Sequence, residues 1–447
     1  MAAKKTARQR AIIRRRLFVS CIAAVLVAAV ALISFTVNSI IKSKNNNNPS
    51  SNPPSSGNSS SAAEPKEPYK TASATVLNTG DIMVHSTMLT GAKTANGYDF
   101  SAFFTKVAPH FKGADLSVAN LEVTFGGTDS GVYSGYPAFN TPDSLADVIK
   151  ESGLGLLLTS NNHCYDTGLF GLKRTLQVLK QRGIPYTGTK ETPDEPYYLV
   201  KDVKGIKIGM VCYTFENNSG VAGRKSINGN IISTEANPLI NSFSYENIDD
   251  FYASAKAAAD AMKDDGADCT VFYMHWGNEY SLKPDTWQKS IAQRLCNLGV
   301  DVIVGGHPHV VQPIELLHAE GSDNTTVCLY SMGNCISNQR QELMDSCPSG
   351  HTEDGVLFSY TFDKYSDGTT VLSAVDVIPT WVNKYPGGSG HLYTIYPLET
   401  ADAGSALGLS GGALSKSAAS YARTKELLAP GLNEIQTLLG GNVRFAD

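Results

Sequence analysis

Within residues 300–315, two histidines closely follow a short apolar run. This pattern is typical of a strand end in an α/β fold. Residues 302–304 are all β-branched, which predicts a buried strand. Two glycines then end the strand and allow a tight turn, so His307 and His309 follow its carboxyl end. Ligands bind at that edge of an open α/β sheet. The pair is therefore a candidate binding site, and two surface histidines in a turn are the simpler alternative.

Similar side chains follow several other predicted strands, which lie near residues 74–78, 116–119, 154–158, 269–274 and 326–330. Taken singly, an Asp after a Gly is more often a turn or cap, and a His at a strand end is more often structural. Repetition at one strand end after another makes chance a poor explanation. The full set comprises Asp81, His85, Glu122, Asn162, His163, His275, His307 and His309.

Helical patterns alternate with these strands, so the chain is predicted to form a largely α/β domain. The expected helices cover residues 143–151, 168–182, 248–263 and 284–298, and a hairpin is expected to turn at residues 204–205. The polar stretch 221–249 is rich in Gly and Asn and suits a long surface loop or lid. After residue 398 one further helix is expected, at residues 418–428.

The first seventy residues have a different character. A basic segment, residues 1–16, precedes an apolar run at residues 17–41 that is long enough to cross a bilayer. The positive-inside rule then predicts a single-pass anchor in the cell membrane, with a cytoplasmic N-terminus and an extracytoplasmic main domain. A cleaved signal peptide is the alternative, whereas Cys21 opens the run and so does not mark a lipoprotein. Residues 42–70 are predicted to be a disordered linker, followed by a domain at 71–396 and a partly helical segment at 397–447.

The charge distribution limits the partners of the main domain. Nine of the 37 Lys and Arg residues lie in the first 44 positions, and all 42 Asp and Glu residues follow position 63. The main domain is therefore acidic and would not attract nucleic acid by its overall field. An anionic substrate would need a local cationic site such as a bound metal.

The eight cysteines include no CxxC pair, which argues against a zinc ribbon or a thioredoxin-like motif. Cys335 and Cys347 could form a disulfide, and the sequence leaves this question open. Cys164 beside His163 could be a nucleophile pair, but neighbouring residues in a chain rarely point at each other. Carboxylates, imidazoles and an amide oxygen instead form a mixed donor set that suits Mn, Fe or Zn. Two such ions about 4 Å apart could clamp a phosphoryl oxygen and generate hydroxide.

Six motifs in order carry a family resemblance: GDIMVH, NLE, NNHCYDTG, HWGNEY, GGHPHVVQPIE and YSMGN. Together they resemble the CapA/PgsA family of poly-γ-glutamate capsule proteins, which is itself similar to the calcineurin-like metallophosphoesterases. The resemblance covers about residues 72–379. It implies a four-layer α/β/β/α metallophosphoesterase-like sandwich, preceded by one transmembrane helix, with a site for two divalent metal ions at the strand ends.

The resemblance also implies roles for individual residues. His163, with Asp166 nearby, matches the catalytic position, where the histidine stabilises charge developing on the substrate. Asp166 and Glu279 could equally orient ligand histidines or cap helices. The implied metal ligands are Asp81, Glu122, Asn162, His275, His307 and His309, and the implied supporting residues are His85, Asn120, Glu279 and Asn334.

Three positions depart from the pattern of the related families. Calcineurin-like enzymes have Asp-x-His in the first motif, but three residues separate Asp81 from His85 here, so His85 is a doubtful ligand. Glu122 stands where phosphatases carry Asp and would take the place of the bridging carboxylate. Gly306 stands where capsule-family members often have another histidine.

The expected function is therefore synthesis, export or processing of an anionic polymer such as poly-γ-glutamate by a metal-dependent hydrolase. One alternative is a polymer-binding subunit that acts with membrane synthase subunits and has no turnover. Another is a phosphodiesterase or phosphatase that acts on a different envelope polymer. The sequence does not decide whether the chain is an enzyme.

Overall fold

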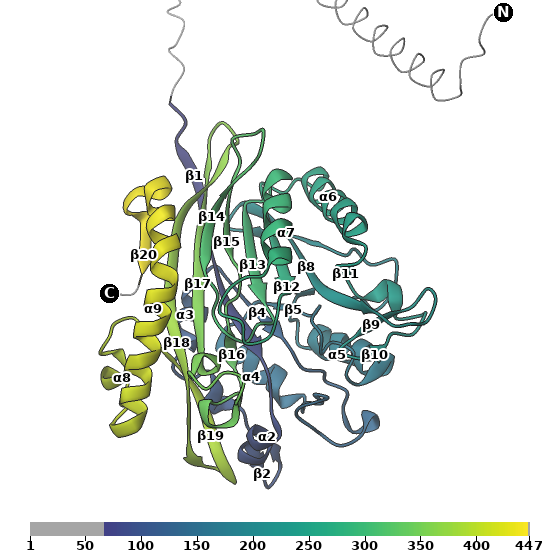
Figure 1. The fold of residues 1–447 in the computed structure, drawn as a ribbon, viewed down its shortest axis with the longest axis vertical. Coiled ribbons are helices and arrows are strands. Elements are labelled where there is room, and N and C mark those ends of the chain that lie inside the picture. The colour runs from purple at the N-terminus through teal and green to yellow at the C-terminus, as the bar shows by residue number, and fades with distance from the viewer. Residues whose placement is uncertain (1–66, 446–447) are drawn as a thin grey trace, which may run out of the picture. The chain divides into compact units, whose positions relative to one another are not determined.

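Two nine-stranded sheets dominate the computed structural model, which describes residues 67–445 (Figure 1). The first sheet has the order β19 (Gly390–Pro397), β18 (Thr370–Gly387), β17 (Asp354–Tyr365), β1 (Lys70–Ile82), β4 (Leu116–Leu121), β5 (Leu156–Leu158) and β6 (Tyr186–Thr187), with β16 (Asn334–Ile336) beside β1 and β20 (Val443–Phe445) beside β18. The second has the order β10 (Asn230–Ile231), β9 (Lys225–Ile227), β8 (Ile206–Asn218), β12 (Cys269–His275), β13 (Val302–Gly306), β15 (Thr325–Leu329) and β14 (Ile314–His318), with β7 (Leu199–Val203) and β11 (Ser242–Ser244) beside β8.

The two sheets pack face to face, and helices cover their outer faces. Neighbouring residues of a strand point to opposite faces. Val76 of β1 therefore joins Met210 of β8 in the core between the sheets, while Leu77 packs on the other side with Leu145 of a helix. The larger helices are α2 (Ser86–Ala92), α3 (Ala108–Gly113), α4 (Ser144–Ser152), α5 (Gly168–Gln181), α6 (Ile248–Asp264), α7 (Thr286–Asn297) and α9 (Gly411–Leu439).

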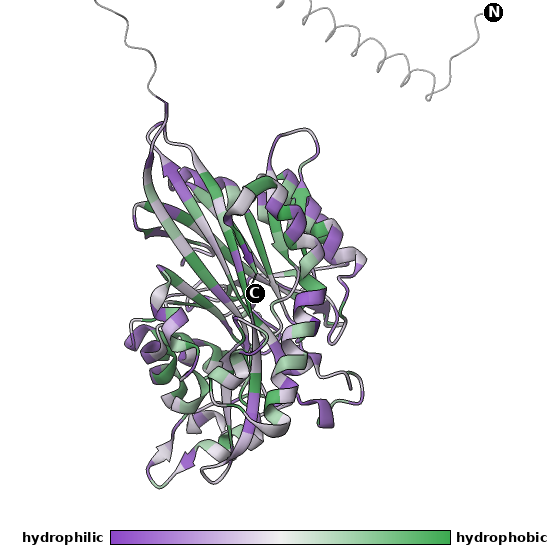
Figure 2. Cartoon of the chain, turned by 90° about the vertical axis from the view of Figure 1, so that its left-hand side faces the viewer, coloured by the Kyte–Doolittle hydropathy of each residue, from purple (hydrophilic) through white to green (hydrophobic). Residues whose placement is uncertain are grey.

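The same alternation holds in the second sheet. Val271 of β12 faces the core between the sheets, whereas Phe272 packs with Phe251 of α6 and Leu295 of α7. Figure 2 shows green, hydrophobic segments along the strands, interspersed with white and purple ones. The prediction of a mixed α/β fold is confirmed.

Helix α9 runs along one side of the two sheets (Figure 1). Leu428, Leu432 and Ile435 recur at helical spacing, are at most 3% exposed, and belong to the core between the sheets. Burying each such side chain contributes about 1.5–3 kcal/mol. This packing explains why the helix continues through Pro430, although the sequence prediction ended it at residue 428.

Parallel pairing fixes the position of the candidate site. Strands β8, β12, β13 and β15 run parallel to one another, and so do β1, β4 and β5. The register pairs His275 with Gly306, and it pairs Asp81 with Asn120 of β4 and with Asn334 of β16. The carboxyl ends of these strands therefore meet at the same edge.

The other predicted elements have mixed outcomes. The four helices and the hairpin at residues 204–205 are present, with ends shifted by no more than two residues. The stretch 221–249 is not one long loop, because it carries β9, β10 and β11, whose backbones pair with each other or with β8. The seven cysteines within the described part are free, so Cys335 and Cys347 form no disulfide.

Residues 1–16, 17–41 and most of 42–70 lie outside the described residues, and their predicted roles stay predictions. Among residues 67–445, no helix is long and apolar enough to cross a membrane. The proposed boundaries at 71–396 and 397–447 also stay predictions.

Candidate metal centre

Acidic and imidazole side chains from both sheets converge at the shared strand edge. Asp81 is the last residue but one of β1 and Glu122 follows β4, while His275 ends β12 and two histidines follow β13. Asp81 Oδ2 lies 3.2 Å from His309 Nδ1. Glu122 Oε1 lies 3.5 Å from His275 Nε2 and 3.8 Å from His309 Nε2. All four side chains are at most 3% exposed, so the cluster is shielded from bulk water.

The remaining two predicted ligands join the same cluster. His307, 5% exposed, offers a ring nitrogen within 4.8 Å of ligand atoms of Glu122 and His275. The amide oxygen of Asn162 lies 2.8 Å from His275 Nε2. The structure thus brings all six predicted ligand residues together.

Burial and mutual charge shift the protonation of this cluster. Burial would raise the pKa of Asp81, but a hydrogen bond with His309 and the positive charge of that ring lower it overall. Burial would lower the pKa of His309, but the charge of Glu122 and the hydrogen bond with Asp81 raise it to about 9. For His307, burial and the neighbouring histidines lower the pKa well below its usual value. In the metal-free protein the His309 ring is therefore held in its charged form beside Asp81.

Two buried ligand atoms in the cluster have no hydrogen-bond partner: Glu122 Oε1 and His307 Nδ1. An unpaired polar atom in the interior costs about 1–3 kcal/mol. Glu122 and His307 belong to one group with His275, in which each residue offers a ligand atom within 4.8 Å of the other two. A divalent cation would satisfy both atoms at once, so the residues fit a metal.

The turn after β13 is strained in a way that aims its histidines. His307 and His309 have backbone φ values of 92° and 55°, which residues other than Gly rarely adopt. Such strain clusters at functional sites. A Cβ on Gly305 would lie 1.9 Å from the Tyr330 carbonyl oxygen, and one on Gly306 would lie 3.0 Å from Asp81 Oδ1. Any side chain in place of Gly306 would therefore press against Asp81.

His163 and Asp166, the predicted catalytic residues, are directly paired. His163 Nδ1 lies 2.7 Å from Asp166 Oδ2, and the same oxygen accepts a hydrogen bond from the Phe139 N–H at 2.7 Å. The Phe139 ring also meets the His163 ring edge-on at 4.7 Å. Asp166 thus orients the imidazole, and it is Thr167 that occupies the N-cap position of α5.

A chain of asparagines holds the carboxylates in place. Asn120 donates to Asp81 Oδ1 at 2.7 Å and to Glu122 Oε2 at 3.2 Å. Asn161 donates to Asn120 Oδ1 at 3.0 Å and accepts the backbone N–H of His163 at 3.1 Å. The sequence prediction missed Asn161, although it precedes Asn162 at the same strand end.

The other supporting residues have different positions. Asn334 donates to the His309 carbonyl oxygen at 3.2 Å. Glu279 is exposed, but its carboxylate lies within 4.8 Å of ring nitrogens of His307 and His309. His85 accepts the backbone N–H of Asn338 at 3.1 Å, and burial and nearby histidines lower its pKa to about 3.

The alternative nucleophile, Cys164, is poorly suited to attack. It is 7% exposed, and burial raises the pKa of its thiol to about 12. The reactive species of a cysteine is the thiolate, so this residue remains in its unreactive form at neutral pH.

Comparison with known proteins agrees with these motifs. The model of the family described as "Bacterial capsule synthesis protein PGA_cap" matches residues 75–339. The "Capsule biosynthesis protein CapA" of Bacillus anthracis is 28% identical over 314 residues, which cover 68% of this chain and 66% of that protein. The "PGA biosynthesis protein CapA" of Bacillus subtilis (strain 168) is 27% identical over 321 residues, covering 69% and 73%.

Solved structures match less closely. The NAD nucleotidase (NadN) of Haemophilus influenzae aligns with a TM-score of 0.40 at 14% identity, covering 84% of this chain and 64% of that one. The protein TT1561 of Thermus thermophilus aligns with a TM-score of 0.32 at 10% identity, covering 64% and 93%. The family model matches more than half of the chain. The chain therefore belongs to the bacterial capsule synthesis (PGA_cap) family, in agreement with its similarity to the two CapA proteins.

Proposed function

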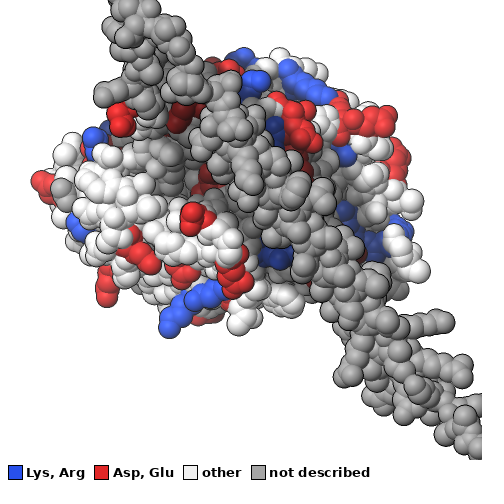
Figure 3. Space-filling view, turned by 90° about the horizontal axis from the view of Figure 1, so that it is seen from above, with Lys and Arg blue, Asp and Glu red and all other residues white. Residues whose placement is uncertain are grey.

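We propose that this protein takes part in the synthesis, export or processing of poly-γ-glutamate, or of a similar anionic surface polymer, as a metal-dependent hydrolase. Membership of the capsule synthesis family and the printed names of the two Bacillus relatives support the polymer. The layering of helices, two sheets and helices is, in this proposal, a metallophosphoesterase-type sandwich. In the part of the face that Figure 3 leaves uncovered, acidic and basic side chains are interspersed.

The observation that supports the proposal most strongly is a pair of buried atoms that have no hydrogen-bond partner, Glu122 Oε1 and His307 Nδ1. Two groups of ligand atoms share Glu122: one adds His275 and His307, and the other adds Asp81 and His309. These groups would hold two divalent ions of Mn, Fe or Zn, with Glu122 common to both. When bound, such ions polarise a phosphoryl or carbonyl oxygen and lower the pKa of water.

The protein's own residues would supply proton handling and orientation. Asp166 fixes the His163 ring through Nδ1, which leaves Nε2 to hydrogen-bond to charge that develops on the substrate. Asn120 keeps Asp81 and Glu122 at fixed positions. Such preorganised groups stabilise a transition state without reorganising during the reaction. This second device, beyond the metal ligands, favours a hydrolase over a subunit that only grips the polymer.

The decisive experiment measures metal content and turnover together. The purified protein would be loaded with Mn²⁺ and assayed for hydrolysis of a generic phosphodiester and of poly-γ-glutamate. We expect bound metal and turnover, both lost in His309→Ala and both kept in His318→Ala, a control at an exposed histidine. The substrate that is cleaved separates the capsule polymer from another envelope polymer. Metal binding without turnover would support the polymer-binding alternative, and no metal after reconstitution would refute the proposal.

The cellular setting is a further part of the proposal. Residues 17–41 would anchor the chain in the membrane, with the described domain outside the cytoplasm and near membrane subunits of a polymer synthase. Membrane fractionation combined with protease accessibility in intact spheroplasts tests this arrangement. A mature N-terminus that begins after residue 30 would refute the anchor.

A further inference from the structure

A short hairpin, formed by β9 and β10, reaches the candidate site from the second sheet. Its base is firmly anchored: Ile227 and Ile232 are at most 1% exposed and pack in a cluster with Leu172 and Leu176 of α5. Lys225 Nζ donates to the Ile240 carbonyl oxygen at 3.1 Å.

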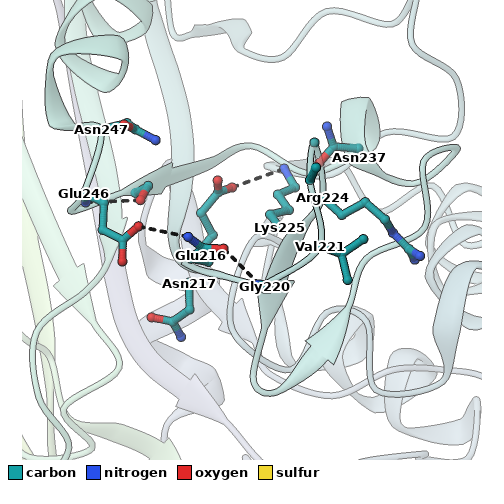
Figure 4. A pocket seen from close by; sticks show the side chains of 13 residues that line it. Glu216, Asn217, Gly220, Val221, Arg224, Lys225, Asn237, Glu246 and Asn247 are labelled. Atoms are coloured by element: carbon teal, nitrogen blue, oxygen red, sulfur yellow. Dashed lines mark hydrogen bonds and ion pairs between the residues drawn. The ribbon is translucent and has the colours of Figure 1, made fainter.

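Lys225 also donates to Ser242 Oγ at 2.5 Å and lies 3.4 Å from Glu216 Oε2. Figure 4 shows Lys225 pointing toward Glu216 at the edge of a cavity of about 540 Å³. The hairpin therefore starts from a fixed position.

The tip of this hairpin presents one carboxamide to His163. Asn228 and Gly229 form the turn with φ values of 49° and 75°, the signature of a tight type I′ hairpin turn. Asn228 is exposed, yet its Nδ2 lies 3.3 Å from His163 Nδ1. The anchored base and the tight turn hold an otherwise solvent-facing side chain against the catalytic histidine.

Hydrogen-bond chemistry shows that this contact does not satisfy the asparagine. Asp166 Oδ2 accepts the Phe139 N–H and lies 2.7 Å from His163 Nδ1. An ionised carboxylate only accepts, so Nδ1 carries the hydrogen and donates it to Asp166. A ring N–H cannot also accept from Asn228, so this contact does not use the amide hydrogens of that exposed residue, and they can donate to an acceptor that lies beside His163.

We propose that Asn228 is a substrate-binding residue whose carboxamide donates a hydrogen bond to an oxyanion, a phosphoryl or carboxylate oxygen, of the group that lies against His163. The inference deepens the proposed function and rests on it, because it names a binding contact in the same site. The hairpin tip then forms one wall of the substrate site, beside His163.

The test compares three variants of the full chain. Asn228→Gly removes the carboxamide without backbone strain at positive φ. Asn228→Asp replaces the hydrogen-bond donor with a carboxylate, which has the same sign of charge as the phosphate ligand. Asn230→Ala removes an exposed carboxamide from the same hairpin and is the matched control. Binding of inorganic phosphate to the Mn²⁺-loaded proteins is measured by titration calorimetry, and imidazole ¹⁵N shifts of His163 are measured in the metal-free proteins.

We expect Asn228→Gly to weaken phosphate binding by about tenfold to hundredfold, as for loss of a hydrogen bond to a charged group. Asn228→Asp should weaken it further, and Asn230→Ala should leave it unchanged. Metal content and the Nδ1–H tautomer of His163 should be the same in all proteins. Equal phosphate affinity in Asn228→Gly and Asn230→Ala would overturn the inference, as would a changed tautomer, which would make Asn228 a support for the ring.

Failure of the proposed function has a different signature. A wild-type protein that binds metal but no phosphate overturns the role of Asn228 alone. A wild-type protein that binds no metal overturns the proposed function, and the inference falls with it.

Discussion

The His309 imidazole should make the stability of the metal-free protein depend on pH between neutral and alkaline conditions. Its pKa rises from 6.5 to about 9, because the charge of Glu122 and the hydrogen bond with Asp81 outweigh burial. At about 1.4 kcal/mol for each tenfold change in proton affinity, this difference corresponds to about 3 kcal/mol. Folding favours the protonated ring, so the contribution is complete below about pH 6.5 and is lost as the pH rises through about 9.

Urea unfolding in EDTA, at several values from about pH 6 to about pH 9.5, measures this contribution. We expect the free energy of unfolding of the wild type to fall by about 3 kcal/mol more than that of His309→Ala over this range. His318→Ala, at an exposed histidine, should follow the wild type. Titrating groups outside this cluster are shared by the wild type and His309→Ala and cancel in the difference. Parallel curves for wild type and His309→Ala would refute the assigned charge state of the cluster.

Three further predictions concern the support of the site. Arg423→Ala removes the cation that lies 2.5 Å from the buried Asp354 Oδ1 and should destabilise the protein by about 3–5 kcal/mol in urea unfolding; a cost below about 1 kcal/mol would contradict a tight pair. Gly431→Ala would place a Cβ 1.7 Å from the Ile314 carbonyl oxygen, so it should displace α9 and lower Tm. Gly412→Ala in the same helix meets no atom within 4 Å and should leave Tm unchanged or slightly higher; equal Tm for both variants would show that α9 does not pack as described. Mn²⁺ at a hundred times its Kd should raise the free energy of unfolding by about 2.7 kcal/mol, and the absence of any EDTA-sensitive shift would argue against a metal site in the folded chain.

The sequence alone determined which side chains would meet. Asp81, Glu122, Asn162, His275 and the two histidines after β13 each lie at or just after the carboxyl end of a strand, and the strands were recognisable from short apolar runs. Parallel strands share one carboxyl edge, so position along the chain translates directly into position in space. The ordered motifs and the helical periodicity were local signals of the same kind, and the family match agrees with them.

Tertiary structure alone decided the contacts that join distant segments. Asn228 contacts His163, 65 residues away in the chain, because buried residues of the hairpin fix its direction. From the sequence, residues 221–249 were predicted only to form a polar surface loop or lid. His307 and His309 adopt positive φ angles in the turn that begins at Gly305, where the backbone lies close to Tyr330. Helix α9 extends past Pro430 because packing against two sheets outweighs local propensity. Such features depend on the free energy of contacts between remote residues, which no local pattern in the chain encodes.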